Sequence, residues 1–230
     1  MNKLIVESKN DKAFIEALIR HLNVAAEVDK PIFIDDFESL DGLNPTKLTV
    51  KLSDVFSEVA KSVPQIEKIG ILLDVDNEGF DKRLQLVNEC LQKTRAKISR
   101  PIEAINQLIQ VEIEGVEIEI ACFFTNVNGI GELETVLKTI KSQDSIYADC
   151  LENWRNCLTH NDKTISDKDF DKFWVANYVR FDTCSNKESK QAGNKCSLQN
   201  FDYVLAKTPT VFDFEHIVLG ELKDFLKLFK

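Results

Sequence analysis

The chain has 230 residues, which is enough to bury a substantial core as one large domain or as a domain with an extension. Its formal net charge is −9 at pH 7, from 29 Lys and Arg against 38 Asp and Glu, and this balance argues against a protein that coats duplex nucleic acid through a basic face. The first residues lack the apolar run of a signal peptide, and no apolar stretch of about 18 residues follows. We therefore expect a cytoplasmic protein without a membrane span.

Strands and helices alternate over the first part of the chain. Short apolar runs predict the strands, and apolar residues spaced by three and four predict the helices. In chain order we expect strand Lys3–Val6, helix Lys12–Leu22, strand Pro31–Asp35, helix Lys51–Val63, strand Lys68–Leu73 and helix Phe80–Thr94. This order is typical of parallel βαβ units, so we expect an α/β fold with a mostly parallel, Rossmann-like sheet flanked by helices.

The pattern changes in the middle of the chain. Apolar residues alternate with Glu over Val111–Ile120, which predicts half-exposed strands with a hairpin turn at Glu114-Gly115. An apolar strand, Ala121–Phe124, completes this element, and helical spacing follows over Leu133–Ile140. We place the end of an α/β domain, residues 1–143, just after this helix.

From about Ser145 the spacing is helical. Aromatic residues at helical spacing are usually core residues, and we expect that role for Trp154, Phe170, Phe173, Trp174 and Tyr178. The chain closes with an amphipathic basic segment in which acidic residues interrupt the basic face, so packing on the sheet is favoured over membrane attachment. Residues 144–230 are therefore predicted to form a helical extension that packs back on the core.

Two aspartates follow the strand Lys68–Leu73 in a D-x-D-x-x-G pattern. Asp74 and Asp76 stand at the carboxyl end of this buried strand, and Gly79 closes the pattern. In an open α/β sheet that edge is where ligands bind. Nearby like charges repel, so such a pair is stable mainly with a cation or a proton between the carboxylates. The alternative is that Asp76 simply caps the helix that follows.

A second acidic strand end lies near the N-terminus. Glu7 follows the first strand, and Asp11 falls in the first turn of the next helix. Because parallel strands end at the same edge, Glu7 is expected to converge with Asp74 and Asp76. Asp11 has an alternative role, since an acid in a first helical turn complements the helix dipole.

A glutamate after the first strand, followed by D-x-D-x-x-G after a later strand, resembles the Toprim domain. Within that fold the segment from Val6 to Lys12 is most similar to the branch of the overcoming-lysogenization-defect nucleases, and the closing stretch Phe212–Phe229 resembles a family of small Toprim-like proteins. The resemblance departs from the usual pattern at Ser8, where a small Gly often stands. An arginine- or tyrosine-bearing nucleic-acid module is also not evident.

This resemblance implies Mg²⁺-dependent phosphoryl transfer, with Mn²⁺ as a substitute. By analogy the catalytic residues are Glu7, Asp74 and Asp76, and the metal ligands are Glu7, Asp11, Asp74, Asp76 and Glu132. Glu132 follows the G-x-G at Gly129 and Gly131, which is by itself a weak phosphate-binding signal. In the nuclease-like branch an acid near this point serves a second metal position. Glu132 is favoured over Glu134 because it stands at the turn, and its alternative role is an acid placed favourably in a first helical turn.

Two function classes remain open from the sequence. The first is a nuclease-like hydrolase that cleaves nucleic acid phosphodiesters, with nucleic acid or a nucleotide as partner. The second is a non-catalytic metal- or nucleotide-binding or regulatory module that retains the acidic pocket. The sequence identifies neither a protein partner nor an oligomeric state. It also gives no clear basic groove, since the Lys and Arg groups at 93–100 and 187–195 are typical of solvated faces.

Two other families with phosphate chemistry match the sequence less well. Haloacid-dehalogenase-like phosphatases also start from D-x-D after a strand, but they usually have Thr or Val where Glu78 stands. A receiver domain would use Asp35 and Asp36, yet the required order of phosphoacceptor and Lys does not follow.

Overall fold

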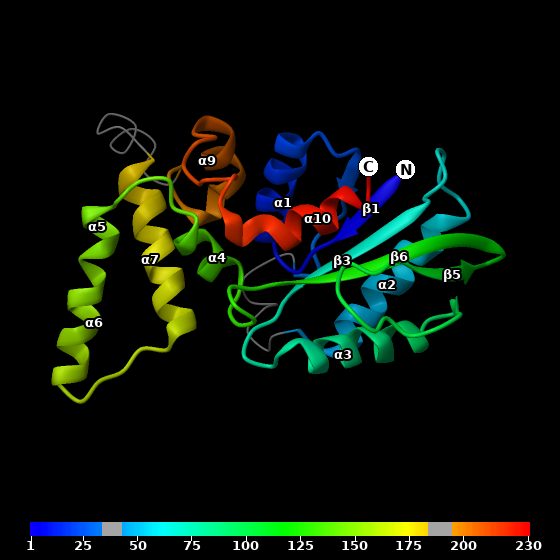
Figure 1. The fold of residues 1–230 in the computed structure, drawn as a ribbon, viewed down its shortest axis with the longest axis horizontal. Coiled ribbons are helices and arrows are strands. Elements are labelled where there is room, and N and C mark those ends of the chain that lie inside the picture. Colours follow the sequence, from blue (N-terminus) through cyan, green and yellow to red (C-terminus); the bar gives the residue numbers. More distant parts are fainter. Residues whose placement is uncertain (34–42, 184–194) are drawn as a thin grey trace.

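The computed structural model describes residues 1–33, 43–183 and 195–230 (Figure 1). In chain order its elements are β1 Asn2–Ile5, α1 Lys9–Leu22, β2 Ala26–Val28, α2 Pro45–Val59, β3 Lys68–Asp74, α3 Phe80–Gln92, β4 Lys97–Ile98, β5 Ile109–Ile113, β6 Val116–Thr125, α4 Leu133–Thr139, α5 Ile146–Asp149, α6 Leu151–His160, α7 Asp167–Asp182, η1 Leu198–Asn200, α9 Phe201–Lys207, η2 Ile217–Leu219 and α10 Gly220–Lys227. The Asp35-Asp36 pair, Lys187 and Lys190 lie outside the described residues.

A six-stranded sheet in the order β2-β1-β3-β6-β5-β4 forms the centre of the molecule. The strands β2, β1, β3 and β6 are parallel, and β5 and β4 add an antiparallel edge. Helices separate the parallel strands along the chain, as the alternating pattern predicts. The expected α/β class with a mostly parallel sheet flanked by helices is confirmed.

Each face of the sheet has its own hydrophobic core. Successive strand residues point to opposite faces, so Leu72 and Phe123 lie on one side while Leu73 and Phe124 lie on the other. The core on the first side includes residues of α1, α4 and α10 and extends to α7, which packs on α4, and to α9, which packs on α1. The core on the second side is covered by α2 and α3 (Figure 1). Segments from both ends of the chain therefore share one core with the sheet.

The register aligns the carboxyl ends of the parallel strands. β3 pairs with β6 from Lys68 opposite Glu119 to Asp74 opposite Thr125. β1 pairs with β3 up to Ile5 opposite Ile71, so the residues that follow β1 run beside the end of β3. This alignment brings the segments after the three strands to one edge.

The second strand differs from its predicted position. We expect it at Pro31–Asp35, but the ladder to β1 is made by Ala26–Val28. Beyond it, Ile32 and Phe33 still donate backbone hydrogen bonds to the β1 side at 3.0 and 2.8 Å. Pro31 has no N–H to donate, which interrupts the ladder and leaves residues 31–33 outside the strand. Residues 34 and 35 of the predicted strand lie outside the described residues.

Two of the expected core aromatics lie near the surface. Phe170, Trp174 and Tyr178 are buried as predicted, but Trp154 and Phe173 are 39% and 43% exposed and pack on one another with ring centroids 5.3 Å apart. Helix α6 lies at the end of the molecule far from the sheet and has no buried residue (Figure 1). The prediction was wrong for these two side chains because, among the described residues, no further layer covers α6.

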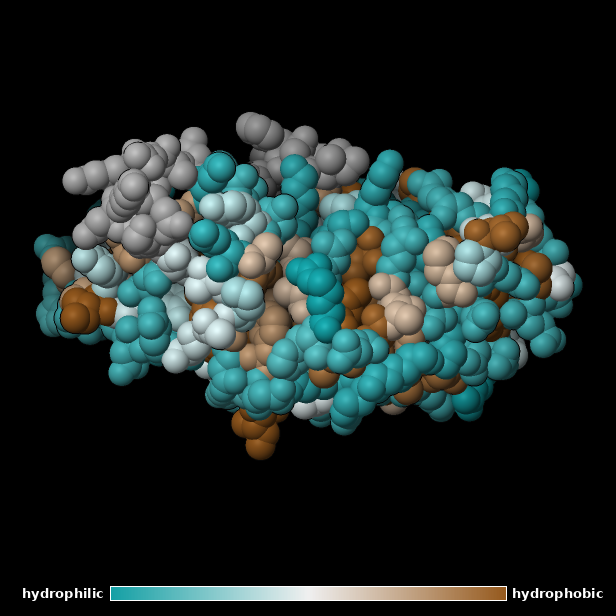
Figure 2. Space-filling model, turned by 90° about the horizontal axis from the view of Figure 1, so that it is seen from above, coloured by the Kyte–Doolittle hydropathy of each residue, from teal (hydrophilic) through white to brown (hydrophobic). Residues whose placement is uncertain are grey.

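The surface above α1, α9 and α10 is mainly hydrophilic, and hydrophobic side chains show between the polar ones near the middle of this face (Figure 2). Across residues 1–33, 43–183 and 195–230, no helix combines the length and the apolar composition needed to cross a membrane.

Candidate functional site

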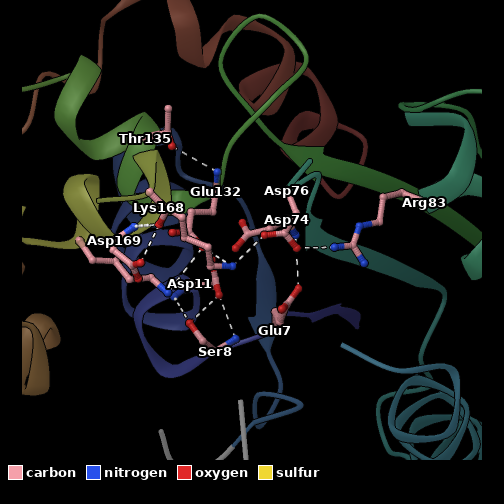
Figure 3. Close-up of polar contacts among 12 residues, drawn as sticks. Glu7, Ser8, Asp11, Asp74, Asp76, Arg83, Glu132, Thr135, Lys168 and Asp169 are labelled. Carbon is pink, nitrogen blue, oxygen red and sulfur yellow. Dashed lines mark hydrogen bonds and ion pairs between the residues drawn. The ribbon is translucent and has the colours of Figure 1, made fainter. Parts of the chain in front are cut away.

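Glu7 and Asp74 are neighbours at the carboxyl edge of the sheet. Asp74 is the last residue of β3, and Glu7 follows the end of β1 by two positions. The backbone N–H of Asp74 donates to the Glu7 carboxylate at 3.4 Å. The structure thus brings together the two acids that end separate strands and stand far apart in the sequence (Figure 3).

Asp76 and Glu132 come from two loops that are joined by their backbones. The Asp76 N–H donates to the Gly131 carbonyl at 2.9 Å, and the Gly131 N–H donates to the Asp76 carbonyl at 3.1 Å. Glu132 is the next residue and the N-cap of α4, where its N–H donates to Thr135 Oγ1 at 3.4 Å. The loop after β6 therefore places Glu132 beside the loop after β3.

Asp76 does not cap the helix that follows it. The N-cap of α3 is Gly79, which has no side chain that could make a capping hydrogen bond. The backbone of Asp76 is left-handed, with φ of 50°, and this turn carries its carboxylate back toward the edge of the sheet. The capping interpretation of Asp76 is therefore wrong.

Asp11 combines a helix-capping role with a place beside the other acids. Its carboxylate accepts hydrogen bonds from the Ser8 N–H at 2.8 Å and from the Ser8 hydroxyl at 2.6 Å, and its own N–H donates to Ser8 Oγ at 3.3 Å. Asp11 is also buried, and its charge raises the pKa of both Glu7 and Asp74. Ser8, which departs from the Toprim pattern, thus holds this acid in position.

Both glutamates near the start of α4 are buried. Glu132 is 4% exposed and Glu134 is 8% exposed. The sequence favours Glu132 over Glu134 as a member of the acidic site. In the structure the charges of both Glu132 and Glu134 raise the pKa of Asp74. We therefore define the acid cluster as Glu7, Asp11, Asp74, Asp76, Glu132 and Glu134.

Burial and mutual repulsion make the acid cluster costly to ionise. Burial raises the pKa of Asp74 well above its usual range, and the charges of Asp11 and Glu7 raise it further. Burial raises the pKa of Glu7 to about 7, with contributions from Asp11 and Asp76, although the Arg83 charge lowers it. A positive charge placed beside these side chains would favour their ionised forms.

The same causes act on two further members of the acid cluster. Burial raises the pKa of Asp11, although the hydrogen bonds from Ser8 oppose this effect. Burial also raises the pKa of Glu134 to about 7, and the charge of Glu132 adds to the shift.

Three cations reach the outer side of the acid cluster. Lys168 Nζ lies 2.9 Å from Asp76 Oδ1 and 2.9 Å from Glu132 Oε2, and Lys172 Nζ lies 3.6 Å from the same Glu132 oxygen. Arg83, buried on α3, donates to the other carboxylate oxygen of Asp76. Partial burial opposes the charge of Lys168, but its hydrogen bonds to Glu132 and Asp76 outweigh this cost and raise its pKa.

Arg83, Lys168 and Lys172 were not among the predicted site residues. Lys97, in the basic group at 93–100 that the sequence offers, pairs with Glu112 on β5, at the antiparallel edge of the sheet. A signal for Arg83 was present, since it stands four residues before the buried Val87 on the apolar face of α3. Lys168 gave no such signal, because it lies 92 residues from Asp76 on a helix rich in charged residues.

Two carboxylate oxygens on the inner side of the acid cluster are buried and have no hydrogen-bond partner among the described residues. These are Asp74 Oδ1 and Glu132 Oε1. A buried unpaired carboxylate oxygen is costly, and a proton, a water molecule or a cation at this place would satisfy it. In the described part of the chain no group of three or more His, Cys, Asp or Glu side chains is already arranged to hold a metal ion. Asp76 and Glu132 instead contact the ammonium group of Lys168.

A pocket of about 460 Å³ opens beside Asp76. Arg83 and Lys168 line it, together with Lys82, which pairs with Glu78 at 2.9 Å. Positive side chains thus border the acid cluster even though the chain as a whole is acidic.

The family model described as "Protein of unknown function (DUF3226)" matches residues 1–230. The chain belongs to the DUF3226 family. No curated protein and no solved structure matches it. For this DUF3226 protein a functional proposal therefore rests on the geometry and the electrostatics of the acid cluster.

Proposed function

We propose that the protein is a Mg²⁺-dependent phosphoryl-transfer enzyme of Toprim type that cleaves nucleic acid phosphodiesters. One observation carries this proposal: within a cluster of carboxylates, the buried oxygens Asp74 Oδ1 and Glu132 Oε1 have no partner in the part of the chain that the structure describes. A cation at this place would remove both the repulsion and the unmet hydrogen-bonding capacity.

The donor atoms fit a hard divalent ion. The expected ligands Glu7, Asp11, Asp74, Asp76 and Glu132 offer carboxylate oxygens alone, which Mg²⁺ and Mn²⁺ prefer. When bound, such an ion supplies polarisation of a phosphoryl oxygen and stabilisation of the leaving oxygen.

Glu7 is suited to handle a proton. Its pKa of about 7 gives it comparable protonated and ionised populations near neutral pH, which is the range in which a general base works best. Its position next to the Asp74 N–H fixes one carboxylate oxygen and leaves the other for a water or substrate proton. Arg83 and Lys82 supply positive charge in the adjoining pocket for an anionic substrate backbone.

The proposal is tested by turnover of labelled single- and double-stranded oligonucleotides in Mg²⁺, in Mn²⁺ and with a chelator. Glu7→Gln and Asp74→Asn are expected to reduce metal-dependent cleavage by at least about 100-fold with the fold unchanged. Asp54→Asn, which changes an exposed acid on α2, is the matched control and should cleave as the unaltered protein does. Equal cleavage by all three variants would contradict the proposal.

A second candidate is a non-catalytic metal- or nucleotide-binding regulatory module. It is favoured by the ammonium group of Lys168, which already neutralises Asp76 and Glu132 in the protein. Metal binding that depends on Asp74, without cleavage of any of these substrates, would support this module over the enzyme.

A further inference from the structure

Lys168 bridges two carboxylates that come from different loops. Its Nζ lies 2.9 Å from Asp76 Oδ1, in the loop after β3, and 2.9 Å from Glu132 Oε2, at the start of α4 (Figure 3). Both contacts are charge-assisted hydrogen bonds of normal length. The ammonium group therefore occupies the space between two of the carboxylates that the proposed function assigns to the metal.

A metal ion and this ammonium group would compete for the same carboxylates. An ion on the inner side of the acid cluster would meet Asp74 Oδ1 and Glu132 Oε1, for which the described residues supply no partner. Its charge would repel the ammonium group of Lys168 and draw negative charge away from Asp76 and Glu132. Metal binding would therefore weaken the contacts of Lys168 with these two carboxylates.

The pocket beside Asp76 can receive the ammonium group once it is released. Lys168 already lines this pocket, and Arg83 lines it from the opposite helix. The Lys168 side chain is 48% exposed and leaves from a helix end, so it can reorient without unpacking the core. An anion in the pocket would then meet two cations.

We propose that Lys168 is an exchangeable counter-ion, which holds Asp76 and Glu132 in the metal-free protein and binds the substrate phosphate after the metal has taken these carboxylates. This inference rests on the proposed metal-dependent function and names a substrate-binding residue for the same site. It predicts that Lys168 weakens metal binding but strengthens substrate binding.

The first test is calorimetric titration with Mn²⁺. Lys168→Met removes the competing charge and is expected to bind Mn²⁺ at least about tenfold more tightly than the unaltered protein, which corresponds to about 1.4 kcal/mol. Lys168→Arg keeps the charge and should stay within about threefold of the unaltered protein. Lys163→Met removes an exposed lysine that precedes α7 and should leave the affinity unchanged.

The second test is binding of a fluorescently labelled ten-nucleotide oligothymidylate, followed by anisotropy with Ca²⁺ present to limit turnover. Lys168→Met is expected to bind it about tenfold more weakly than the unaltered protein and the Lys163→Met control. Oligonucleotide affinity equal to that of the control would overturn the substrate role of Lys168.

The outcomes separate this inference from the proposed function. If neither the unaltered protein nor Lys168→Met binds Mn²⁺, the metal site itself is refuted. If the unaltered protein binds Mn²⁺ and Lys168→Met binds it equally or more weakly, the metal site stands and the exchange by Lys168 is refuted.

Discussion

Asp76 and Gly131 exchange two backbone hydrogen bonds, of 2.9 and 3.1 Å, that tie the loop after β3 to the loop after β6. The two residues also share left-handed backbones, with φ of 50° and 95°. This pairing positions Asp76 and Glu132 relative to one another, because Asp76 takes part in it and Glu132 directly follows Gly131. The acid cluster is thus assembled by loop backbone as much as by the strands.

Gly131→Ala is expected to disturb the site from the backbone. A Cβ at this position would lie 2.6 Å from Thr135 Oγ1, the atom that accepts from the Glu132 N–H, and the positive φ adds strain. We expect a loss of about 2–3 kcal/mol in the free energy of unfolding and weaker metal binding. Urea denaturation and Mg²⁺ titration measure the two effects.

Gly115→Ala is the matched control for this change. Gly115 has φ of 85° in the β5–β6 turn, but no atom lies within 4 Å of its added Cβ. The Gly115→Ala variant should lose only about 1–2 kcal/mol in the free energy of unfolding and bind Mg²⁺ as the unaltered protein does. Equal loss of Mg²⁺ binding in both variants would contradict the positioning role of Gly131.

The metal-free protein should lose stability as the pH rises. The pKa of Glu134 is about 7 in the folded protein against 4.5 in its ordinary state, so the folded chain binds more protons between these values than the unfolded chain. Its contribution to the free energy of unfolding therefore falls from about pH 4.5 to pH 7 and then levels off. The difference between the two pKa values corresponds to a change of about 3 kcal/mol in the free energy of unfolding.

The pH dependence is measured by urea denaturation at several pH values with a chelator present. Glu134→Gln cannot ionise and should show a fall between pH 5 and pH 8 that is smaller by up to about 3 kcal/mol. A variant with the same pH dependence as the unaltered protein would show that Glu134 does not carry the effect.

The affinity for metal should rise with pH, whereas the stability of the metal-free protein falls. The ligands must be ionised to bind a metal, and the pKa of Glu7 is about 7. Mg²⁺ affinity is therefore expected to increase between pH 6 and pH 8, with proton release that calorimetry in buffers of different ionisation enthalpy detects. Affinity independent of pH over this range would count against Glu7 as a ligand.

Asp76→Gly should be at least as stable as Asp76→Ala, which reverses the usual order of these residues. Both variants remove the carboxylate and its contacts with Arg83 and Lys168, but glycine accepts the left-handed φ of 50° without strain. Alanine pays about 1–2 kcal/mol for that conformation. A clearly more stable alanine variant in urea denaturation would show that the turn is not held left-handed.

Gly70→Ala should weaken the contact between β3 and the end of the chain. An added Cβ would lie 2.6 Å from Leu4 Cδ2 and 2.7 Å from Phe229 Cζ, and both side chains are fully buried. We expect a cost of about 1–3 kcal/mol in the free energy of unfolding. The double variant Gly70→Ala with Phe229→Leu should show a favourable coupling energy, and simple additivity would contradict this contact.

The sequence was sufficient to predict most of the sheet. β1 and β3 were located because each is a short apolar run, and β6 was located from an alternating stretch that continues into the apolar residues Ala121–Phe124. The common edge of parallel strands then implied that Glu7 and Asp74 lie together. The second strand was misplaced because it covers three residues, Ala26–Val28, with a buried side chain only at Val28. A segment so short leaves too few residues for a pattern.

The cations of the site could not be predicted in the same way. Lys168 meets Asp76 only because α7 packs beside α4, and this packing is set by tertiary contacts of Phe170 and Trp174 within the core. The left-handed turn at Asp76 was equally hidden, since it depends on pairing with Gly131. Local patterns therefore indicated the acids and gave a signal for Arg83, whereas long-range packing supplied the counter-charge of Lys168.

A metal site at the acid cluster is tested most directly by calorimetric titration of the metal-free protein with Mg²⁺ at pH 8, beside Asp74→Asn and the surface control Asp54→Asn. We expect saturable binding by the unaltered protein and by Asp54→Asn, and binding weakened at least about tenfold or lost in Asp74→Asn. Equal binding by Asp74→Asn, or no binding by the unaltered protein, would contradict a metal site at the acid cluster.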